Sequence, residues 1–146
     1  MFKLGIIGAG WIADKMAATL AHAEDYCIHA IASRSFEKAE AFAQKWGISK
    51  AYGSYEDLVK DENIDLVYVA TPHSHHYEHA FLAIRNNKPV LVEKAFTANA
   101  QEAEQLINEA RSRNVLIAEA IWTRYMPLSK KVKEIMDSGI IGIPRI

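Results

Sequence analysis

Five short apolar runs, separated by stretches with helical periodicity, constrain the fold more than any other feature of the sequence. The runs are rich in Ile, Val and Leu and span residues 4–7, 28–32, 66–70, 90–92 and 115–118. Their apolar residues are consecutive instead of alternating, which is typical of strands covered on both faces in a parallel sheet. Right-handed crossovers stack such alternating units into one sheet. We therefore predict an α/β fold, a doubly wound parallel sheet with helices on both faces.

Local signals mark the ends of several predicted helices. Ser35 precedes helical spacing over residues 36–46, and Gly47 stands where a left-handed stop belongs. Asn99 precedes another helix, and Glu102 three residues on completes a variant of the capping box. The remaining helices are expected after Gly10, from Ser54, from about Ser74 to Arg85, and over the stretch that carries Leu128, Val132, Ile135 and Met136 and ends at Gly139.

The tail after Gly139 differs from the rest of the chain. Its sequence, IIGIPRI, has the apolar character of the opening of another strand. No sequence follows that could pair with such a strand, which favours a chain that has been cut. A natural terminus that docks on the sheet is the alternative.

Composition limits the class of protein and its partners. At 146 residues, half of them hydrophobic, the chain has the size of one domain and can bury a sizeable core. Its 17 basic and 18 acidic residues nearly cancel, so we expect neither nucleic acid nor a membrane as a partner. The N-terminal apolar run is too short for a signal peptide or a membrane span. Cys27 is the only cysteine, which excludes an internal disulfide framework and fits a reducing, cytoplasmic setting.

A glycine-rich turn follows the first apolar run and opens the first helix. Gly8, Gly10 and Ala13 form the pattern GxGxxA, with Trp11 and Ile12 inside it. In this context the first glycine permits a tight turn, and the second lets the backbone approach a pyrophosphate. The small third residue allows close packing of helix and strand. We expect the loop to bind a dinucleotide, with Trp11 and Ile12 among its contacts; an ordinary strand-to-helix turn is the alternative.

The residues that end the second strand indicate which dinucleotide is bound. Ser33 stands about twenty residues beyond the loop, where an acidic residue would hold the ribose hydroxyls of NAD. A carboxylate there would repel a 2′-phosphate, whereas Ser33 can donate a hydrogen bond and Arg34 can pair with phosphate oxygens. Lys38, one helical turn on, would add positive potential if it points back toward the loop. We expect NADP, with NAD as the alternative, unless Arg34 and Lys38 are simply solvated at a helix start.

Four histidines crowd the turn after the run at 66–70, namely His73, His75, His76 and His79. No cysteine or paired carboxylate joins them in this segment, so we expect no metal site; a zinc site is the alternative. Some of these side chains are expected to line a cofactor cleft and others to be exposed on the helix. Ligands in this architecture bind at strand ends near the point where the strand order reverses.

A Glu-Lys pair, Glu93 and Lys94, follows the run at 90–92 and should emerge at the carboxyl edge of the sheet. A lysine at that edge could bond a substrate oxygen and pass a proton, or act as a fixed positive charge. Taken alone, such a pair indicates ordinary surface residues.

Together these residues carry a family resemblance. The GxGxxA loop, the run ATPHSHH and the motif VEKA resemble the nucleotide-binding domain of the glucose-fructose oxidoreductase and inositol dehydrogenase family (Gfo/Idh/MocA). The stretches AYGSYEDLVKDENID and EARSRNVLIAEAIWTRYMP are similar to its dihydrodiol dehydrogenase-like branch. The resemblance covers the whole chain in order. It implies a Rossmann doubly wound fold and hydride transfer between nicotinamide and a CH-OH or C=O carbon of a small sugar, polyol or diol.

The resemblance also implies roles for individual residues. Lys94 matches the catalytic motif residue near the reacting oxygen, and Glu93 matches a residue beside the nicotinamide ribose. The other matches are positions that approach the cofactor or the substrate: Thr71, Pro72, His73, His76, Trp122 and Arg124. Core packing of Trp122 and a surface ion pair at Arg124 are the alternatives.

Two substitutions and the length of the chain depart from the family pattern. Ala95 replaces the usual proline of Glu-Lys-Pro, and His73 stands where many members have Asn. Members also carry a second α+β domain, which supplies most of the substrate pocket and is absent here. We therefore predict an NAD(P)-binding domain over 1–122, and a helix with the start of the crossing into the second domain over 123–146.

The same pattern sets expectations for activity and assembly. The isolated chain is expected to turn over little or no substrate, because most of the substrate pocket lies in the absent domain. The full-length protein is expected to be a homo-oligomer. A dinucleotide-binding or sensing module without catalysis is the alternative function.

Overall fold

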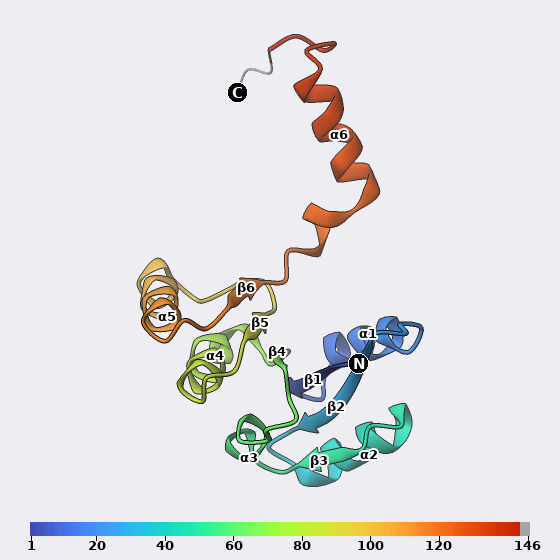
Figure 1. The fold of residues 1–146 in the computed structure, drawn as a ribbon, viewed down its shortest axis with the longest axis vertical. Coiled ribbons are helices and arrows are strands. Elements are labelled where there is room, and N and C mark those ends of the chain that lie inside the picture. Colours follow the sequence, from blue (N-terminus) through green and yellow to red (C-terminus); the bar gives the residue numbers. More distant parts are fainter. Residues whose placement is uncertain (144–146) are drawn as a thin grey trace.

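The computed structural model describes residues 1–143 and places six parallel strands in one sheet between two layers of helices (Figure 1). The strand order is β3-β2-β1-β4-β5-β6, and every neighbouring pair is parallel. The strands are β1 Phe2–Ile7, β2 Tyr26–Ala32, β3 Lys50–Tyr52, β4 Leu66–Val69, β5 Val90–Val92 and β6 Ile117–Glu119. The chain winds outward from β1 to β3 and then returns to β4 on the other side of β1. This reversal confirms the predicted doubly wound α/β fold.

Helices cover both faces of the sheet, as the sequence predicts. Helices α1 (Trp11–Leu20) and α2 (Phe36–Trp46) pack on one face, and α3 (Tyr55–Val59), α4 (His76–Arg85) and α5 (Ala100–Ser112) pack on the other. Successive strand residues divide between the two cores. Ile6 packs with Ala13 of α1, whereas Ile7 packs with Ile84 of α4. The sheet is therefore buried on both sides, which explains its consecutive apolar residues.

The predicted cap residues begin helices α2, α3 and α5. Their side chains accept hydrogen bonds from backbone N–H groups two or three residues into each helix: Ser35 from Lys38 at 3.3 Å, Ser54 from Asp57 at 3.2 Å, and Asn99 from Glu102 at 2.9 Å. Gly47, with φ of 65°, ends α2 in the left-handed conformation. Capping satisfies N–H groups that have no partner within the helix, so these polar residues fix where each helix starts.

Several local predictions differ from the structure. Strand β3 lies outside the five predicted runs, because two of its three residues are Lys50 and Tyr52. The run predicted at 115–118 starts too early, since Val115 packs against the core before β6 begins at Ile117. Residues 140–142 form a turn instead of the predicted strand, and residues 144–146 of the same tail lie outside the described residues.

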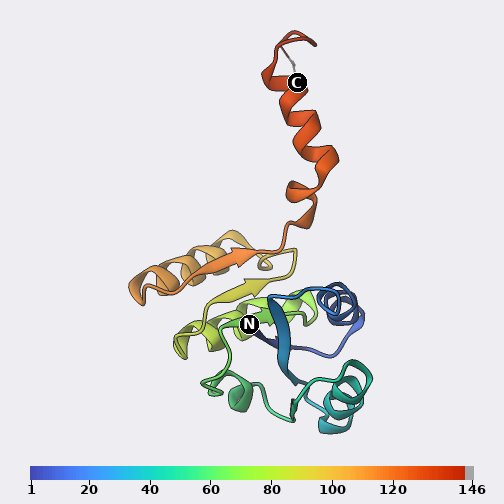
Figure 2. The same ribbon diagram turned by 45° about the vertical axis from the view of Figure 1, so that its right-hand side comes forward.

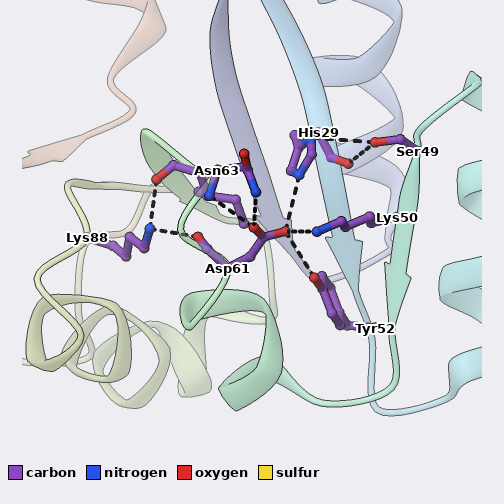
Figure 3. Close-up of polar contacts among 8 residues, drawn as sticks. His29, Ser49, Lys50, Tyr52, Asp61, Asn63 and Lys88 are labelled. Carbon is purple, nitrogen blue, oxygen red and sulfur yellow. Dashed lines mark hydrogen bonds and ion pairs between the residues drawn. The ribbon is translucent and has the colours of Figure 1, made fainter.

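A buried carboxylate joins β2, β3 and the segment between α3 and β4 (Figure 3). Oδ2 of Asp61 accepts hydrogen bonds from Lys50 Nζ at 2.9 Å and Tyr52 Oη at 3.0 Å, and lies 3.2 Å from Nε2 of His29. Oδ1 accepts from the backbone and side-chain amides of Asn63. Burial alone would raise the pKa of Asp61, but the bonds from Lys50, Asn63 and Tyr52 together hold it well below its usual range. The ionised carboxylate therefore fastens this segment to the β3 edge of the sheet.

The last helix, α6 (Pro127–Asp137), follows a short 3-10 helix at Trp122–Tyr125 and projects away from the sheet (Figures 1 and 2). None of its residues is buried, and its apolar face is exposed, comprising Leu128, Val132, Ile135 and Met136. No helix within residues 1–143 is both long enough and apolar enough to cross a membrane.

Candidate functional site

The predicted site residues gather at the carboxyl edge of the sheet. They follow directly after five strands: Gly8, Gly10, Trp11 and Ile12 after β1, Ser33 and Arg34 after β2, Thr71, Pro72 and His73 after β4, Glu93 and Lys94 after β5, and Trp122 and Arg124 after β6. Since all strands are parallel, these ends meet along one edge. The reversal of strand order between β1 and β4 lies in the middle of that edge, where ligands bind in open α/β sheets.

Gly8 brings the first loop against the end of β4. Its φ of 103° disfavours any residue with a side chain. A Cβ atom at this position would lie 2.9 Å from the carbonyl oxygen of Ala70 and 3.0 Å from Cγ2 of Thr71. The backbone N–H of Gly8 donates to the carbonyl oxygen of Ala32 at 2.9 Å. Gly8 therefore allows the ends of β1, β2 and β4 to pack closely together.

Gly10 leaves the N-terminus of α1 open. It occupies the cap position, but no side chain caps the first turn, and a Cβ built on Gly10 would meet nothing within 4 Å. Ala13 is fully buried, which lets the helix lie close to the strand as predicted. The free N–H groups and the helix dipole together favour an anion at this end of α1.

The single acidic residue in the first turn of α1 is neutralised by α2. Asp14 forms an ion pair with Lys45 and accepts a hydrogen bond from Trp46 Nε1 at 2.9 Å. The bond from Lys45, with that from Trp46, lowers the pKa of the Asp14 carboxyl. Trp11 at the start of the helix is 72% exposed, and Ile12 is half-buried. The open end of α1 thus keeps its positive character.

A hollow of about 440 Å³ lies beside the ends of β2, β3 and β4. Arg34, Thr71 and Pro72, three of the residues expected to contact a cofactor, line it. Its volume falls in the range of small-molecule sites. The other lining residues are Gly53, Ser54, Tyr55, Glu56, His75, Glu78 and His79. Most of these were missed from the sequence, because they follow or face β3, which the apolar pattern did not reveal.

Two of the four histidines belong to this hollow. His75 lies at the N-cap of α4 and His79 within the helix, and their rings are 5.6 Å apart. Nδ1 of His79 is 2.9 Å from Oγ1 of Thr71, and burial lowers the pKa of His79. His73 is exposed, whereas His76 is fully buried. No group of three or more His, Cys, Asp or Glu side chains that could hold a metal ion lies within residues 1–143.

A second hollow, of about 390 Å³, lies between α1 and α2. Lys38 lines it together with Gly10 and Trp11, so this lysine does face the glycine loop. Ser33 lies at the end of β2, where its N–H donates to the carbonyl oxygen of Tyr52 and its hydroxyl accepts from the N–H of Ser35. Positive side chains thus lie on both hollows, Arg34 on the first and Lys38 on the second, which the glycine loop also lines.

Glu93 is buried at the end of β5 and anchors the turn that carries Lys94. It is 6% exposed; Oε1 accepts from Tyr68 Oη at 2.5 Å, and Oε2 accepts from the backbone N–H of Lys94 at 3.1 Å. Burial, and then the bond to Glu93, raises the pKa of Tyr68. Lys94 is exposed, and its peptide bond to Ala95 is cis. No sequence pattern singled out Tyr68, which is one apolar-run residue among several.

Trp122 and Glu93 meet at a third hollow, of about 260 Å³, at the ends of β5 and β6. Leu91, Ala120 and Tyr125 also line it. Trp122 is 59% exposed, so it does not serve as core packing within the described residues. Arg124 is exposed on the same short helix.

Comparison with known proteins agrees with this geometry. Residues 2–120 match the family described as an oxidoreductase family with an NAD-binding Rossmann fold, GFO_IDH_MocA. The chain is 40% identical over 146 residues to the trans-1,2-dihydrobenzene-1,2-diol dehydrogenase of Mus musculus. It is 44% identical over 152 residues to the D-xylose 1-dehydrogenase (NADP(+)) of Hypocrea jecorina. These alignments cover 99% and 96% of this chain but 44% and 39% of the two enzymes.

Solved structures of similar fold also match nearly all of this chain but less than half of their own length. A 3-ketoreductase from Actinomadura kijaniata in complex with NADP superposes with a TM-score of 0.89 at 32% identity, over 97% of this chain and 45% of the ketoreductase. The chain therefore spans less than half the length of the relatives it matches. The resemblance predicted from the GxGxxA, ATPHSHH and VEKA motifs is confirmed. This chain belongs to the Gfo/Idh/MocA oxidoreductase family, and it contains that family's NAD(P)-binding Rossmann domain.

Proposed function

We propose that this chain is the nucleotide-binding part of an enzyme that transfers a hydride between NADP and a hydroxyl- or carbonyl-bearing carbon of a small sugar, polyol or diol. One observation carries the cofactor preference. Arg34 lines the large hollow directly after β2, and no acidic residue follows that strand at the position that would hold the ribose of NAD. The substrate class is supported by the names of two relatives, a dihydrodiol dehydrogenase and a xylose dehydrogenase that is itself named for NADP(+).

The residues present fit a dinucleotide. The uncapped N-terminus of α1 and the open space beside Gly10 suit pyrophosphate oxygens. Arg34 and Lys38 can supply charge-assisted hydrogen bonds to a 2′-phosphate. Glu56 and Glu78 also line the hollow of Arg34 and would repel a phosphate placed beside them. We therefore place the phosphate toward Arg34 and Lys38, with the adenine side of the cofactor in the larger hollow.

The ends of β5 and β6 provide the candidate reaction site. The bound dinucleotide supplies or accepts the hydride. Glu93 and Trp122 would line the space beside its nicotinamide, because both face the third hollow. Lys94, exposed directly after β5, would hold the substrate oxygen with its ammonium group and move a proton to or from it. Glu93 fixes the start of this turn through the backbone N–H of Lys94.

We assign residues 1–122 to the NAD(P)-binding domain and 123–146 to the start of a crossing into a substrate domain. The exposed apolar face of α6 and the greater length of the relatives support this division. A homo-oligomeric full-length protein remains a proposal. So does a cytoplasmic location, which the single Cys27 favours.

Titration calorimetry of the 146-residue chain with NADP and NAD, at one ionic strength, tests the cofactor site. We expect tighter binding of NADP. Arg34→Ala should weaken NADP binding by about 10- to 100-fold, because a charge-assisted contact contributes roughly 1.5–3 kcal/mol, and should change NAD affinity little. Arg111→Ala, at an exposed position of α5, is the matched control. Equal affinity for both nucleotides would refute the NADP preference, and absence of binding would refute the site in this chain.

Lys94→Ala in the full-length protein tests the catalytic assignment. We expect hydride transfer at least about 100-fold slower than in the wild type, with NADP affinity unchanged, because positioned acid-base groups contribute about 10²–10⁴ in rate. Unchanged turnover in this variant would exclude Lys94 as the proton-transferring residue.

A further inference from the structure

His76, the first residue of α4, bridges two of the loops at the carboxyl edge of the sheet. Its side chain is fully buried. Nε2 lies 2.8 Å from the carbonyl oxygen of Thr71, and Nδ1 lies 2.7 Å from the carbonyl oxygen of Ala95. One contact reaches the end of β4, and the other reaches the turn after β5, directly beside Lys94.

Both partners of this ring are acceptors. A backbone carbonyl oxygen carries no proton, so each short contact is a hydrogen bond only if the ring nitrogen carries one. Neutral imidazole has a single N–H, and its other nitrogen would direct a lone pair at an oxygen less than 3 Å away. Only the doubly protonated imidazolium satisfies both contacts.

We infer that His76 is a cationic positioning residue that holds the Lys94 turn against the end of β4. This inference rests on the proposed function of Lys94. The rest of the turn is held in the same manner by charged groups: Lys94 N–H donates to Glu93, and Phe96 N–H donates to Oε1 of Glu119 at 2.8 Å. Residues 94–96 are thus fixed from β5, from β6 and from α4. The contact from α4 is made by the His76 ring alone among these three.

Several charged and titratable groups lie near His76 in the fold. The ring of His73 lies 5.3 Å away from the preceding 3-10 helix, and His79 follows one turn later on α4. Across the contact with Ala95 lie Glu93, Lys94 and the Glu119 that binds Phe96. Loss of the proton removes one of the two bonds, so the Lys94 turn loosens from β4 as the pH rises.

Nuclear magnetic resonance of the 146-residue chain, labelled with ¹⁵N in its histidine rings, tests the charge directly. At about pH 7.5 an exposed imidazole is mostly neutral, because its ordinary pKa is about 6.5. We expect both ring nitrogens of His76 to carry protons at that pH. A His76 ring with one unprotonated nitrogen would overturn the inference. The readout needs no cofactor, so it stands or fails independently of NADP binding.

The positioning role has its own readout in the carbonyl ¹³C signals of Thr71 and Ala95. Both should shift together with the His76 ring as the pH is raised. His76→Gln, whose amide nitrogen can donate but whose amide oxygen cannot, should remove this shared pH-dependent shift. His22→Gln should leave it intact. If the two carbonyl signals do not shift when the His76 ring titrates, the positioning role of His76 is refuted. If the His76→Gln variant does not fold, the pH titration of the wild-type chain alone provides the test.

In the full-length enzyme, the positioning of the Lys94 turn by His76 predicts different effects on kcat and on the KM for NADP. His76→Gln should lower kcat by about 10-fold or more, with a smaller change in the KM for NADP, because a misplaced catalytic group costs rate more than binding. The kcat of the wild type should also fall as the His76 ring loses its proton, and that fall should be absent from the variant. A variant with the wild-type pH profile of kcat would contradict the positioning role.

Discussion

Asp61→Asn should destabilise the fold more than any comparable surface substitution, because it removes the charge at the centre of the network in Figure 3. The Asp61 side chain is 3% exposed. Asparagine keeps an oxygen for the two Asn63 amides but turns an NH₂ group toward Lys50 and Tyr52. The ammonium group of Lys50 can only donate, so the new amide cannot satisfy it, and the Tyr52 hydroxyl loses its charged acceptor.

The magnitude follows from the burial of each partner. Lys50 is 42% exposed and can turn to water, so losing its ion pair costs only about 0.5 kcal/mol. The hydroxyl of half-buried Tyr52 loses a bond to a charged acceptor, which costs about 1.5 kcal/mol. Loss of the contact with His29 adds about 1 kcal/mol. Together these effects amount to about 3 kcal/mol, or about 10 °C in Tm for a domain of this size.

Urea denaturation at several pH values provides the assay, with Asp25→Asn at an exposed position as the control. The pKa of Asp61 is lower in the folded than in the unfolded chain. Its carboxylate therefore stabilises the fold above about pH 4, and this contribution declines as the pH falls below that value. The difference between wild type and Asp61→Asn should be constant from about pH 5 to 7 and shrink below about pH 4. A loss no larger than that of Asp25→Asn, or one that grows on acidification, would refute the reasoning.

Four further substitutions, at three positions, test other parts of the structure. Gly8→Ala should cost about 1–3 kcal/mol in urea denaturation, because it combines a positive φ with a contact of 2.9 Å to Ala70; a neutral result would mean that the loop adapts. Asn99→Ala should cost about 1 kcal/mol and Asn99→Gly only a few tenths, and the absence of any loss in Asn99→Ala would show that the cap bond contributes nothing. Burial and Glu93 raise the pKa of Tyr68, so in an ultraviolet pH titration it should be the last of the six tyrosines to ionise. Its contribution to stability is present below about pH 10 and lost above it, and a Tyr68→Phe variant with the wild-type titration curve would contradict this assignment.

Local sequence signals predicted the elements whose causes are themselves local. Ser35, Ser54 and Asn99 begin helices because each binds N–H groups within its own first turn. The run at 90–92 is a strand with the predicted bounds. Strand β3 was missed because Lys50 and Tyr52 point toward Asp61, a residue about ten positions away whose surroundings, KDENID, indicate only a loop. No periodicity in the sequence reveals that such an aspartate is buried.

The residues of the candidate site were likewise predictable only where the signal is local. Glycine motifs and strand ends predicted which residues would meet at the carboxyl edge, because parallel strands bring their ends together. They did not predict which of the four histidines would be buried. The burial of His76 depends on Ala95, nineteen residues further along the chain, and that of Tyr68 on Glu93. These contacts join separate strand ends, and a pattern within one segment contains no information about them.

Gly10, at the start of α1, leaves the helix less stable than a polar cap residue would, but keeps its N–H groups open to an anion. Helices α2, α3 and α5 each begin with a polar side-chain cap, whereas α1 begins at Gly10 with none. The φ of Gly10 is −99°, a value open to any residue, so the backbone does not require glycine here. Gly10→Ser would supply a cap and stabilise the free protein by a few tenths of a kcal/mol, while occupying the N–H groups that an anion needs. A directed-evolution campaign that selects for heat resistance alone would therefore be expected to erode the very loop on which cofactor binding depends.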